Sequence, residues 1–223
     1  MNKTKKAELT TTKVHTISRD NIFLKQPQFK LFYTEEPCVD YINTQKNLYL
    51  FGEDKNTTNS KIFCALTQEA IHLLSLSKKY HLYEYYSGTQ ELKFFLDIDI
   101  KKKNIPDNCN RQELFDIIIN ESLDLVTKVF KDKFKIDKPK IILWSSCRED
   151  KLSAHAIFPD IIFKNIYDMK FFMSEIESKT NSWLFKEKIL DMNPYRKGCF
   201  RLPWNSKMGS GVNLEFYKTI NCE

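Results

Sequence analysis

The sequence predicts a two-layer α+β fold, in which a small N-terminal α/β module packs on a larger βαββαβ module. Two observations on periodicity support this. Short strand-like segments lie between residues 21 and 90, and from residue 91 onward strand-like segments alternate with two long segments whose apolar residues recur at helical spacing. In addition, 42% of the 223 residues are hydrophobic and 17 are Phe, which is enough apolar material for a packed core.

The N-terminal third is expected to contain a tail and the smaller module. Residues 1–20 are basic and Thr-rich and predict a flexible tail. In the module, residues 21–90, "NLYLFG" and "KIFCAL" predict strands. The segment "TQEAIHLLSLSKKY" has apolar residues at helical spacing after Thr67, which predicts a helix with Thr67 as its N-cap.

The larger module, residues 91–223, is expected to form one sheet. The predicted elements are a strand at 92–100, a helix at 111–131, strands at 138–146 and 151–158, a helix at 165–180, and two late strands near Phe200 and at 212–220. The order βαββαβ is typical of ferredoxin-like or RNA-recognition-type (RRM-like) sheets with two helices on one face.

Composition narrows the class of protein. No apolar run reaches the roughly 20 residues of a membrane span, and the N-terminus lacks the apolar core of a secretory signal, so an intracellular, soluble protein without membrane contact is expected. The six cysteines form no C-x-x-C pair, which predicts reduced thiols and no zinc site. The net charge of +6 mildly favours a polyanionic partner.

The segment "KFFLDIDIKKK" carries two carboxylates at the end of an apolar strand. Because side chains alternate along a strand, Asp97 and Asp99 share one face with Cα atoms roughly 6.6 Å apart. Two neighbouring carboxylates repel each other unless a cation or hydrogen bonds offset them, and hard oxygen ligands suit Mg²⁺ or Mn²⁺. The alternative is a strand end where both carboxylates are solvated beside the lysines.

Two further segments carry polar side chains. In "SSCREDKLSAHAIF", Lys151, Ser153 and His155 share one strand face and could donate to phosphate oxygens, although a lone histidine within a polar patch is the common alternative. In "LDMNPYRKGCFRLPWNSKMG", one acid, Asp191, precedes several cations that either solvate a loop or hold polyphosphate or nucleic acid. These cations are Arg196, Lys197, Arg201 and Lys207.

These motifs occur in an order that resembles a known catalytic core. Asp-x-Asp, then Ser-x-His, then Asp followed by a basic Phe-Arg-Leu segment, is similar to the archaeo-eukaryotic primase superfamily, above all to eukaryotic primase-polymerases (PrimPol) and the primases of large DNA viruses. The strings "HLYEYYSGTQELKFFLDIDI", "EDKLSAHAIF", "LDMNPYRKGCFRLPWNSKMG" and "VNLEFY" carry the resemblance, which covers roughly residues 25–218.

The resemblance implies a DNA-templated primase-polymerase that transfers nucleotides from NTP or dNTP to a 3′-OH. Asp97, Asp99 and Asp191 would be the catalytic residues and would hold two divalent ions, Mg²⁺ or Mn²⁺. The nucleotide-binding residues would be Lys61, Lys151, Ser153, His155, Arg196, Arg201 and Lys207. A single-stranded or primed DNA template, nucleoside triphosphates, and a helicase or single-strand-binding protein would be the partners, in a nucleus, a mitochondrion or a viral replication site.

The chain departs from the family pattern in two places. Asp99 stands where the PrimPol branch often has Glu, and the stretch from Tyr195 to Phe200 is one residue short, so that Arg196 or Lys197 would replace an arginine of the pattern. The competing interpretation is a non-catalytic RRM-like module that binds single strands through surface aromatics such as Phe95. A rolling-circle initiator is disfavoured because no two histidines are two residues apart.

Overall fold

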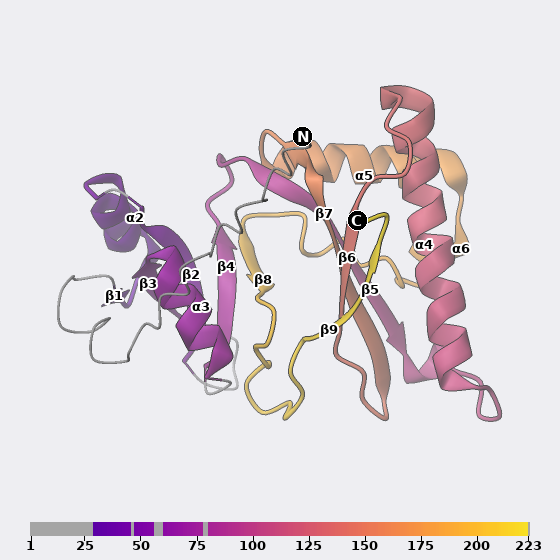
Figure 1. The fold of residues 1–223 in the computed structure, drawn as a ribbon, viewed down its shortest axis with the longest axis horizontal. Coiled ribbons are helices and arrows are strands. Elements are labelled where there is room, and N and C mark those ends of the chain that lie inside the picture. The colour runs from indigo at the N-terminus through magenta and orange to yellow at the C-terminus, as the bar shows by residue number, and fades with distance from the viewer. Residues whose placement is uncertain (1–28, 46, 56–59, 78–79, 223) are drawn as a thin grey trace, which may run out of the picture.

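A computed structural model describes residues 29–45, 47–55, 60–77 and 80–222 of the protein. These ranges form two antiparallel sheets and a set of helices, so the predicted α+β class is confirmed. Figure 1 shows the first sheet, indigo to magenta except for the yellow-orange β8, beside the second sheet, with α4 on the far side of the second sheet. The predicted tail, residues 1–20, lies outside the described residues.

The first sheet has the strand order β1-β3-β2-β4-β8. Its strands are β1 (Phe29–Phe32), β2 (Tyr49–Asp54), β3 (Lys61–Leu66), β4 (Leu82–Tyr86) and β8 (Gly198–Arg201), and the helices of this part are α2 (Glu35–Asn43) and α3 (Gln68–Leu76). Thr67 caps α3 as predicted, because its hydroxyl accepts a hydrogen bond from the N–H of Ala70.

The second sheet has the order β5-β7-β6-β9. Its strands are β5 (Leu92–Lys101), β6 (Ile141–Ser145), β7 (Lys151–Phe163) and β9 (Glu215–Ile220), and the helices around it are a 3₁₀ turn (Lys102–Asn104), α4 (Arg111–Phe134), α5 (Ile166–Thr180) and α6 (Trp183–Lys186). The order of elements is the predicted βαββαβ, with β9 beside β6.

One late strand leaves the second sheet. The segment around Phe200 was expected among the strands of the larger module, but β8 pairs with β4 and becomes the edge of the first sheet, with Tyr83 opposite Arg201. The chain thus returns to the first sheet between α6 and β9. The division of the chain at residue 90 remains a prediction, and this crossing ties the two parts together.

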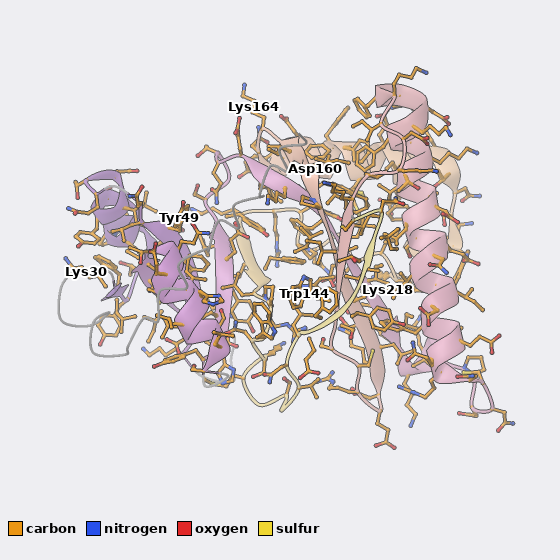
Figure 2. All side chains as sticks on the ribbon, viewed as in Figure 1. Lys30, Tyr49, Trp144, Asp160, Lys164 and Lys218 are labelled. Carbon is orange, nitrogen blue, oxygen red and sulfur yellow. The ribbon has the colours of Figure 1, made fainter. Side chains whose placement is uncertain are left out.

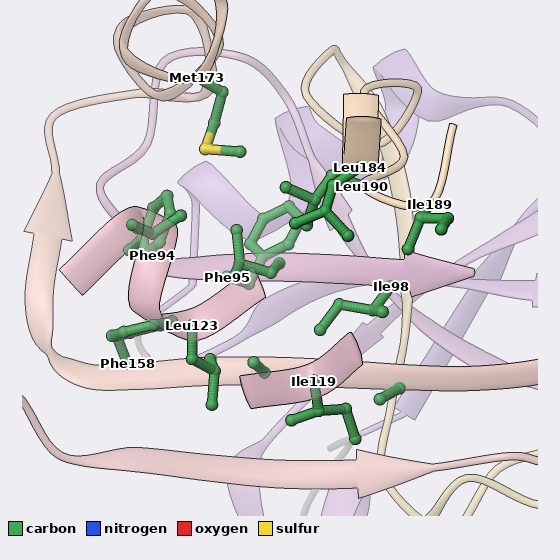
Figure 3. Packing of buried hydrophobic residues seen from close by; sticks show 14 of the residues in the cluster. Phe94, Phe95, Ile98, Ile119, Leu123, Phe158, Met173, Leu184, Ile189 and Leu190 are labelled. Carbon is green, nitrogen blue, oxygen red and sulfur yellow. The ribbon is translucent and has the colours of Figure 1, made fainter. Parts of the chain in front are cut away.

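The core lies between the second sheet and its helices. Phe94, Leu96 and Ile98 of β5 are completely buried, and the ring of Phe94 lies 5.1 Å from that of Phe130 on α4 and 5.7 Å from that of Phe172 on α5. Both helices therefore cover the same face of the sheet, as predicted. Figure 3 shows Phe94 and Ile98 in this core with Ile119 of α4. Each such side chain contributes about 1.5–3 kcal/mol through burial.

The alternation that buries these residues turns the intervening residues of β5 to the opposite face, toward the first sheet. Helix ends are fixed locally: the side chain of Asn110 accepts from the N–H groups of Gln112 and Glu113 at the start of α4. Within the described ranges, no helix is both long enough and apolar enough to cross a membrane.

Candidate active site between the two sheets

Two neighbouring strands present the first polar residues of the site. Asp97 of β5 lies opposite His155 of β7, and Asp99 lies opposite Ser153. The pairing is antiparallel, so these side chains form two adjacent rows on the sheet face away from α4 and α5. The predicted common face of the two aspartates is therefore present in the structure.

Asp191 reaches this face because the segment before it lies along β5. The N–H of Asp99 donates to the carbonyl of Ile189 at 2.7 Å, and the N–H of Asp191 donates to the carbonyl of Asp97 at 2.9 Å. Leu190 forms an isolated bridge with Ile98. Ile189 and Leu190 are buried in the core, which anchors the segment and fixes Asp191 beside the two strand aspartates.

The three carboxylates form a cluster that could hold a divalent cation. One oxygen from each of Asp97, Asp99 and Asp191 lies within 4.8 Å of the others. Oδ1 of Asp97 is buried and, among the described residues, has no hydrogen-bond partner. A buried carboxylate oxygen without a donor is costly, and a cation would remove that cost. The donor set consists of hard oxygens, which fits Mg²⁺ or Mn²⁺.

The electrostatics of Asp97 agree with this arrangement. Burial raises the pKa of Asp97 well above its usual range, and the charges of Asp99 and Asp191 raise it further, whereas Lys151 and Arg201 oppose the rise. Burial and the two neighbouring carboxylates disfavour the ionised form of Asp97, whereas the two cations favour it. The protonated form of Asp97 is therefore favoured, and a cation bound at the cluster would favour the ionised form.

Lys151 and Ser153 satisfy the second aspartate. Nζ of Lys151 contacts Oδ2 of Asp99, and Oγ of Ser153 donates to Oδ1 of Asp99 at 2.7 Å. Both side chains were predicted to bind phosphate. In the structure they lie between Asp99 and the cavity, where a phosphate oxygen would compete with the carboxylate for the same donors.

His155 is held as a neutral ring. Burial lowers the pKa of His155 well below its usual value, and the nearby Arg201 and Lys151 lower it further. The imidazole stacks on Phe200 with ring centroids 4.1 Å apart, and Nε2 lies 3.6 Å from Oδ1 of Asp97. Nδ1 is buried and has no hydrogen-bond partner among the described residues.

A cavity of about 200 Å³ opens between this face and the first sheet. Its lining combines residues of β4, β5, β7 and β8 with the loops that follow β6, α6 and β8. The residues are Tyr83, Asp97, Ser146, Arg148, Lys151, Ser153, His155, Pro194, Cys199, Phe200, Arg201, Lys207, Ser210 and Val212. Four of them are cationic (Arg148, Lys151, Arg201 and Lys207), so the cavity suits an anion next to the carboxylate cluster.

Arg201 links the two walls of the cavity. Its Nη2 donates to Oγ of Ser146 at 2.8 Å, from β8 across to the end of β6. Burial lowers the pKa of the guanidinium, whereas Tyr83 and the carboxylates of Asp97 and Asp99 raise it. Trp144 is on the same sheet face as His155 and lies toward the space between the sheets (Figure 2). The centroid of its ring is 5.0 Å from that of Trp204.

The structure brings most of the predicted residues together and leaves two apart. Lys151, Ser153, His155, Arg201 and Lys207 line the cavity with Asp97, as expected. Lys61 does not line it: Nζ contacts Asp54 and lies 3.6 Å from the centroid of the Tyr83 ring. Arg196 is exposed on the loop and is also outside the lining. Whether any of these residues binds a nucleotide remains a prediction.

Several lining residues were not predicted as site residues from the sequence, among them Arg148, Ser146 and Tyr83. Arg148 was assigned to the hairpin turn before β7, and neither Ser146 nor Tyr83 was proposed as a site residue. Ser146 could have been found from strand alternation, because it follows Trp144 by two residues and so should share its face. In the structure its N–H donates to the carbonyl of Ser153 at 2.9 Å. Tyr83 gave no such signal, because it enters from the other sheet.

The sequence of the chain is similar to parts of two viral proteins. No protein-family model matches the chain. A protein named "Putative primase" from Ostreid herpesvirus 1 (isolate France) is 26% identical over 206 residues, which covers 71% of this chain and 17% of that protein. "Uncharacterized protein ORF49" of the same virus is 35% identical over 92 residues, which covers 34% of this chain and 8% of that protein. The chain thus spans a small part of both relatives and is similar to a viral protein that is named as a primase.

Proposed function

We propose that this chain is the catalytic core of a DNA primase-polymerase, which transfers nucleotides from NTP or dNTP to a 3′-OH on a DNA template. The observation that carries the proposal is the convergence of Asp97, Asp99 and Asp191 beside a cation-lined cavity. The similarity to the herpesvirus protein named as a primase supports the same function.

The three aspartates are proposed to hold two divalent ions, Mg²⁺ or Mn²⁺. When bound, such ions would stabilise the charge that develops on the attacking 3′-oxygen and on the leaving pyrophosphate. Oδ1 of Asp97 supports this role, because it is buried and accepts no hydrogen bond from the described residues.

The cationic and neutral donors of the cavity are proposed to bind the triphosphate. Lys151 and Ser153 would exchange part of their contact with Asp99 for phosphate oxygens, and Arg201 and Lys207 would neutralise charge from the other wall. The neutral His155 would donate a hydrogen bond without adding charge. As the 3′-oxygen displaces pyrophosphate from the α-phosphorus, these donors would keep the leaving group in place.

Lys61 and Arg196 are the weakest members of the proposed nucleotide-binding set. Both were included because of the resemblance, and neither lines the cavity. We propose a DNA template strand and a helicase or single-strand-binding protein as the partners. The process would be replication or damage tolerance, in a nucleus, a mitochondrion or a viral replication site.

The competing binding-module hypothesis has less support. It requires exposed aromatic rings on the sheet face, but Phe95 is only 2% exposed and packs on Tyr195 and Phe200. Tyr86 and Phe200 of the first sheet cover Phe95, whereas Phe216, opposite Trp144 on the same face, is 54% exposed.

Incorporation of labelled nucleotide on a primed template tests the proposal. Wild-type protein should extend the primer with Mg²⁺ or Mn²⁺, and the double variant Asp97→Asn, Asp99→Asn should lose at least about 1000-fold, or about 4 kcal/mol of transition-state stabilisation. Asp116→Asn, remote from the cavity, serves as the matched control and should retain activity. Wild-type protein that binds single strands but incorporates nothing with either ion would favour the binding module.

A further inference from the structure

A buried carboxylate in the first sheet has contacts that the proposed function does not explain. Asp54, at the end of β2, is 5% exposed. It accepts hydrogen bonds from the hydroxyl of Tyr83 at 2.8 Å and from the N–H of Met208 at 3.1 Å, and it contacts Nζ of Lys61. Met208 lies far along the chain, so this one side chain joins three strands of the first sheet, β2, β3 and β4, to a distant segment.

The distant segment comprises residues 203–212 and is called the clamped segment below. Lys207, Ser210 and Val212 from this segment line the cavity. Its backbone is irregular: Trp204, Gly209 and Gly211 all have positive φ, at 60°, 78° and 66°. Backbone hydrogen bonds between Trp204 or Asn205 and Leu214 close the segment into a loop, so its position relative to the cavity depends on its contacts with the rest of the fold.

Asn205 provides a second attachment of the clamped segment. Its side chain is 1% exposed, and Oδ1 accepts from the N–H of Leu82 at 3.1 Å while Nδ2 donates to Oγ of Ser75 at 3.2 Å. Next to it, Nδ1 of His81 is hydrogen-bonded to Ser206, 3.1 Å from the carbonyl oxygen and 2.9 Å from Oγ. The segment is therefore attached to α3, to β4 and, through Asp54, to β2.

We propose that Asp54 and Asn205 are positioning residues that hold the clamped segment, and with it Lys207, in the arrangement that binds the triphosphate. This inference rests on the proposed function of the cavity. Neither residue lines the cavity: each acts through the segment that it holds, and Asp54 acts also through its hydrogen bond from Tyr83. The first sheet is thus the scaffold of one wall of the nucleotide site.

The physical effect of this attachment is on affinity. A flexible segment loses conformational freedom when a ligand orders it, and the ordering weakens binding. If only a tenth of the molecules have the segment in place, the apparent affinity falls about tenfold, while the chemical step in the bound complex is unaffected. Asp54 and Asn205 would keep that fraction close to one.

Two single variants and one control test this. Asp54→Ala removes the acceptor for Met208, and Asn205→Ala independently removes the contacts to Leu82 and Ser75 without leaving a charge behind. Asp116→Ala is the matched control, because Asp116 also accepts three side-chain hydrogen bonds, from Lys218, Gln112 and Tyr217, but joins α4 to β9 away from the cavity.

The first measurement is hydrogen exchange of the peptide that contains Met208, in wild-type and variant proteins without nucleotide. In both positioning variants, exchange in residues 203–212 should rise at least about tenfold, with no change in β5 and β7. Unchanged exchange in the folded variants would overturn the proposal, and so would an equal rise in Asp116→Ala.

The second measurement separates KM from kcat for the nucleotide on a primed template. In Asp54→Ala and Asn205→Ala, KM should rise about tenfold and kcat should stay within about twofold of wild type. A fall in kcat at constant KM would overturn the positioning role, and so would unchanged KM despite faster exchange.

The two failures are distinguishable. If wild-type protein neither binds nor incorporates nucleotides, the proposed function fails and the role of Asp54 and Asn205 in nucleotide affinity fails with it. In that case the exchange measurement still decides whether the two residues hold the segment. If Asp54→Ala does not fold, Asn205→Ala alone decides between the outcomes above.

Discussion

Each sheet contains a lysine–aspartate pair close to the cavity, and the two pairs differ in what lies beside the aspartate. In the first sheet, the Asp54 side chain is 2% exposed and has donors from Lys61, Tyr83 and Met208. In the second sheet, Asp99 has Lys151 and Ser153, but it lies beside Asp97, whose buried Oδ1 has no hydrogen-bond partner among the described residues.

The pKa shifts follow the same division. Burial opposes ionisation of Asp54, but hydrogen bonds from Lys61, Met208 and Tyr83 outweigh it and leave the pKa lower than usual. Burial and two neighbouring carboxylates together raise the pKa of Asp97. A carboxylate with a complete set of donors stabilises the fold, whereas a cluster with an unmet need for positive charge is typical of a functional site.

The free energy of unfolding tests most directly whether Asp54 and Asp97 differ in their contribution to the fold. Asp54→Ala should lower the free energy of unfolding by about 3 kcal/mol, because it leaves Lys61 and a buried N–H without their acceptor. Asp97→Asn should leave it unchanged or raise it by up to about 1 kcal/mol, because it relieves repulsion. Urea denaturation at pH 7 measures both, and equal destabilisation by the two variants would contradict the division.

Divalent ions should stabilise the protein through the aspartate cluster of the second sheet and not through Asp54. At an ion concentration about 100 times its Kd, bound Mg²⁺ or Mn²⁺ would stabilise the wild-type fold by about 2.7 kcal/mol, a rise in Tm of roughly 5 to 10 °C. Asp191→Asn should lose most of this rise, whereas Asp54→Asn should keep it. A thermal shift without nucleotide or DNA measures the effect, and a rise of the same size in Asp191→Asn would argue against a metal site.

His155 tests whether the neighbours of the acidic cluster serve binding or charge balance. His155→Ala should raise KM for the nucleotide about tenfold, or about 1.4 kcal/mol, with a smaller loss in kcat than the double aspartate variant shows. The pKa of His155 is lowered, so the ring is neutral at pH 7 and does not balance the charge of Asp97. A loss of kcat as large as that of the double aspartate variant would place His155 in the chemical step instead.

A third pair, Asp116 with Lys218, gives the smallest effect because it is more exposed than the other two. Its hydrogen bonds with Lys218, then Gln112, lower the pKa of Asp116 to about 2. A lowered pKa means that its stabilisation is present above about pH 4 and is lost as the pH falls toward 2. Screening by solvent limits the effect of Asp116→Asn to roughly 0.5 kcal/mol at pH 7. Urea midpoints at pH 7 and pH 3 measure it, and an equal difference at both values would contradict the assignment.

The sequence was sufficient for contacts that depend on strand alternation. Asp97 and Asp99 share a face, and Lys151, Ser153 and His155 share the facing row, because alternation along a strand is a local property. The helices α4 and α5 were likewise predicted from their apolar periodicity and cover the same face of the sheet.

Contacts that depend on pairing between distant segments could not be read from periodicity. Asp191 reaches the cluster through backbone hydrogen bonds of residues 189–191 to β5, and only the resemblance indicated its role. The pairing of β8 with β4 had no local signal, since a four-residue strand can join any free edge. Lys61 was expected at the phosphates, and the structure gives it a buried partner, Asp54, that no motif indicated.

The return of the chain to the first sheet also affects how the protein is made. β4 leaves the ribosome early, but its partner β8 emerges only after α4, α5 and the rest of the second sheet. Until then, one edge of β4 has no partner from the described part of the chain, and such an edge favours pairing with other chains. The first sheet is therefore completed late in translation, and a ribosome that stalls before residue 198 would leave a nascent chain prone to aggregation.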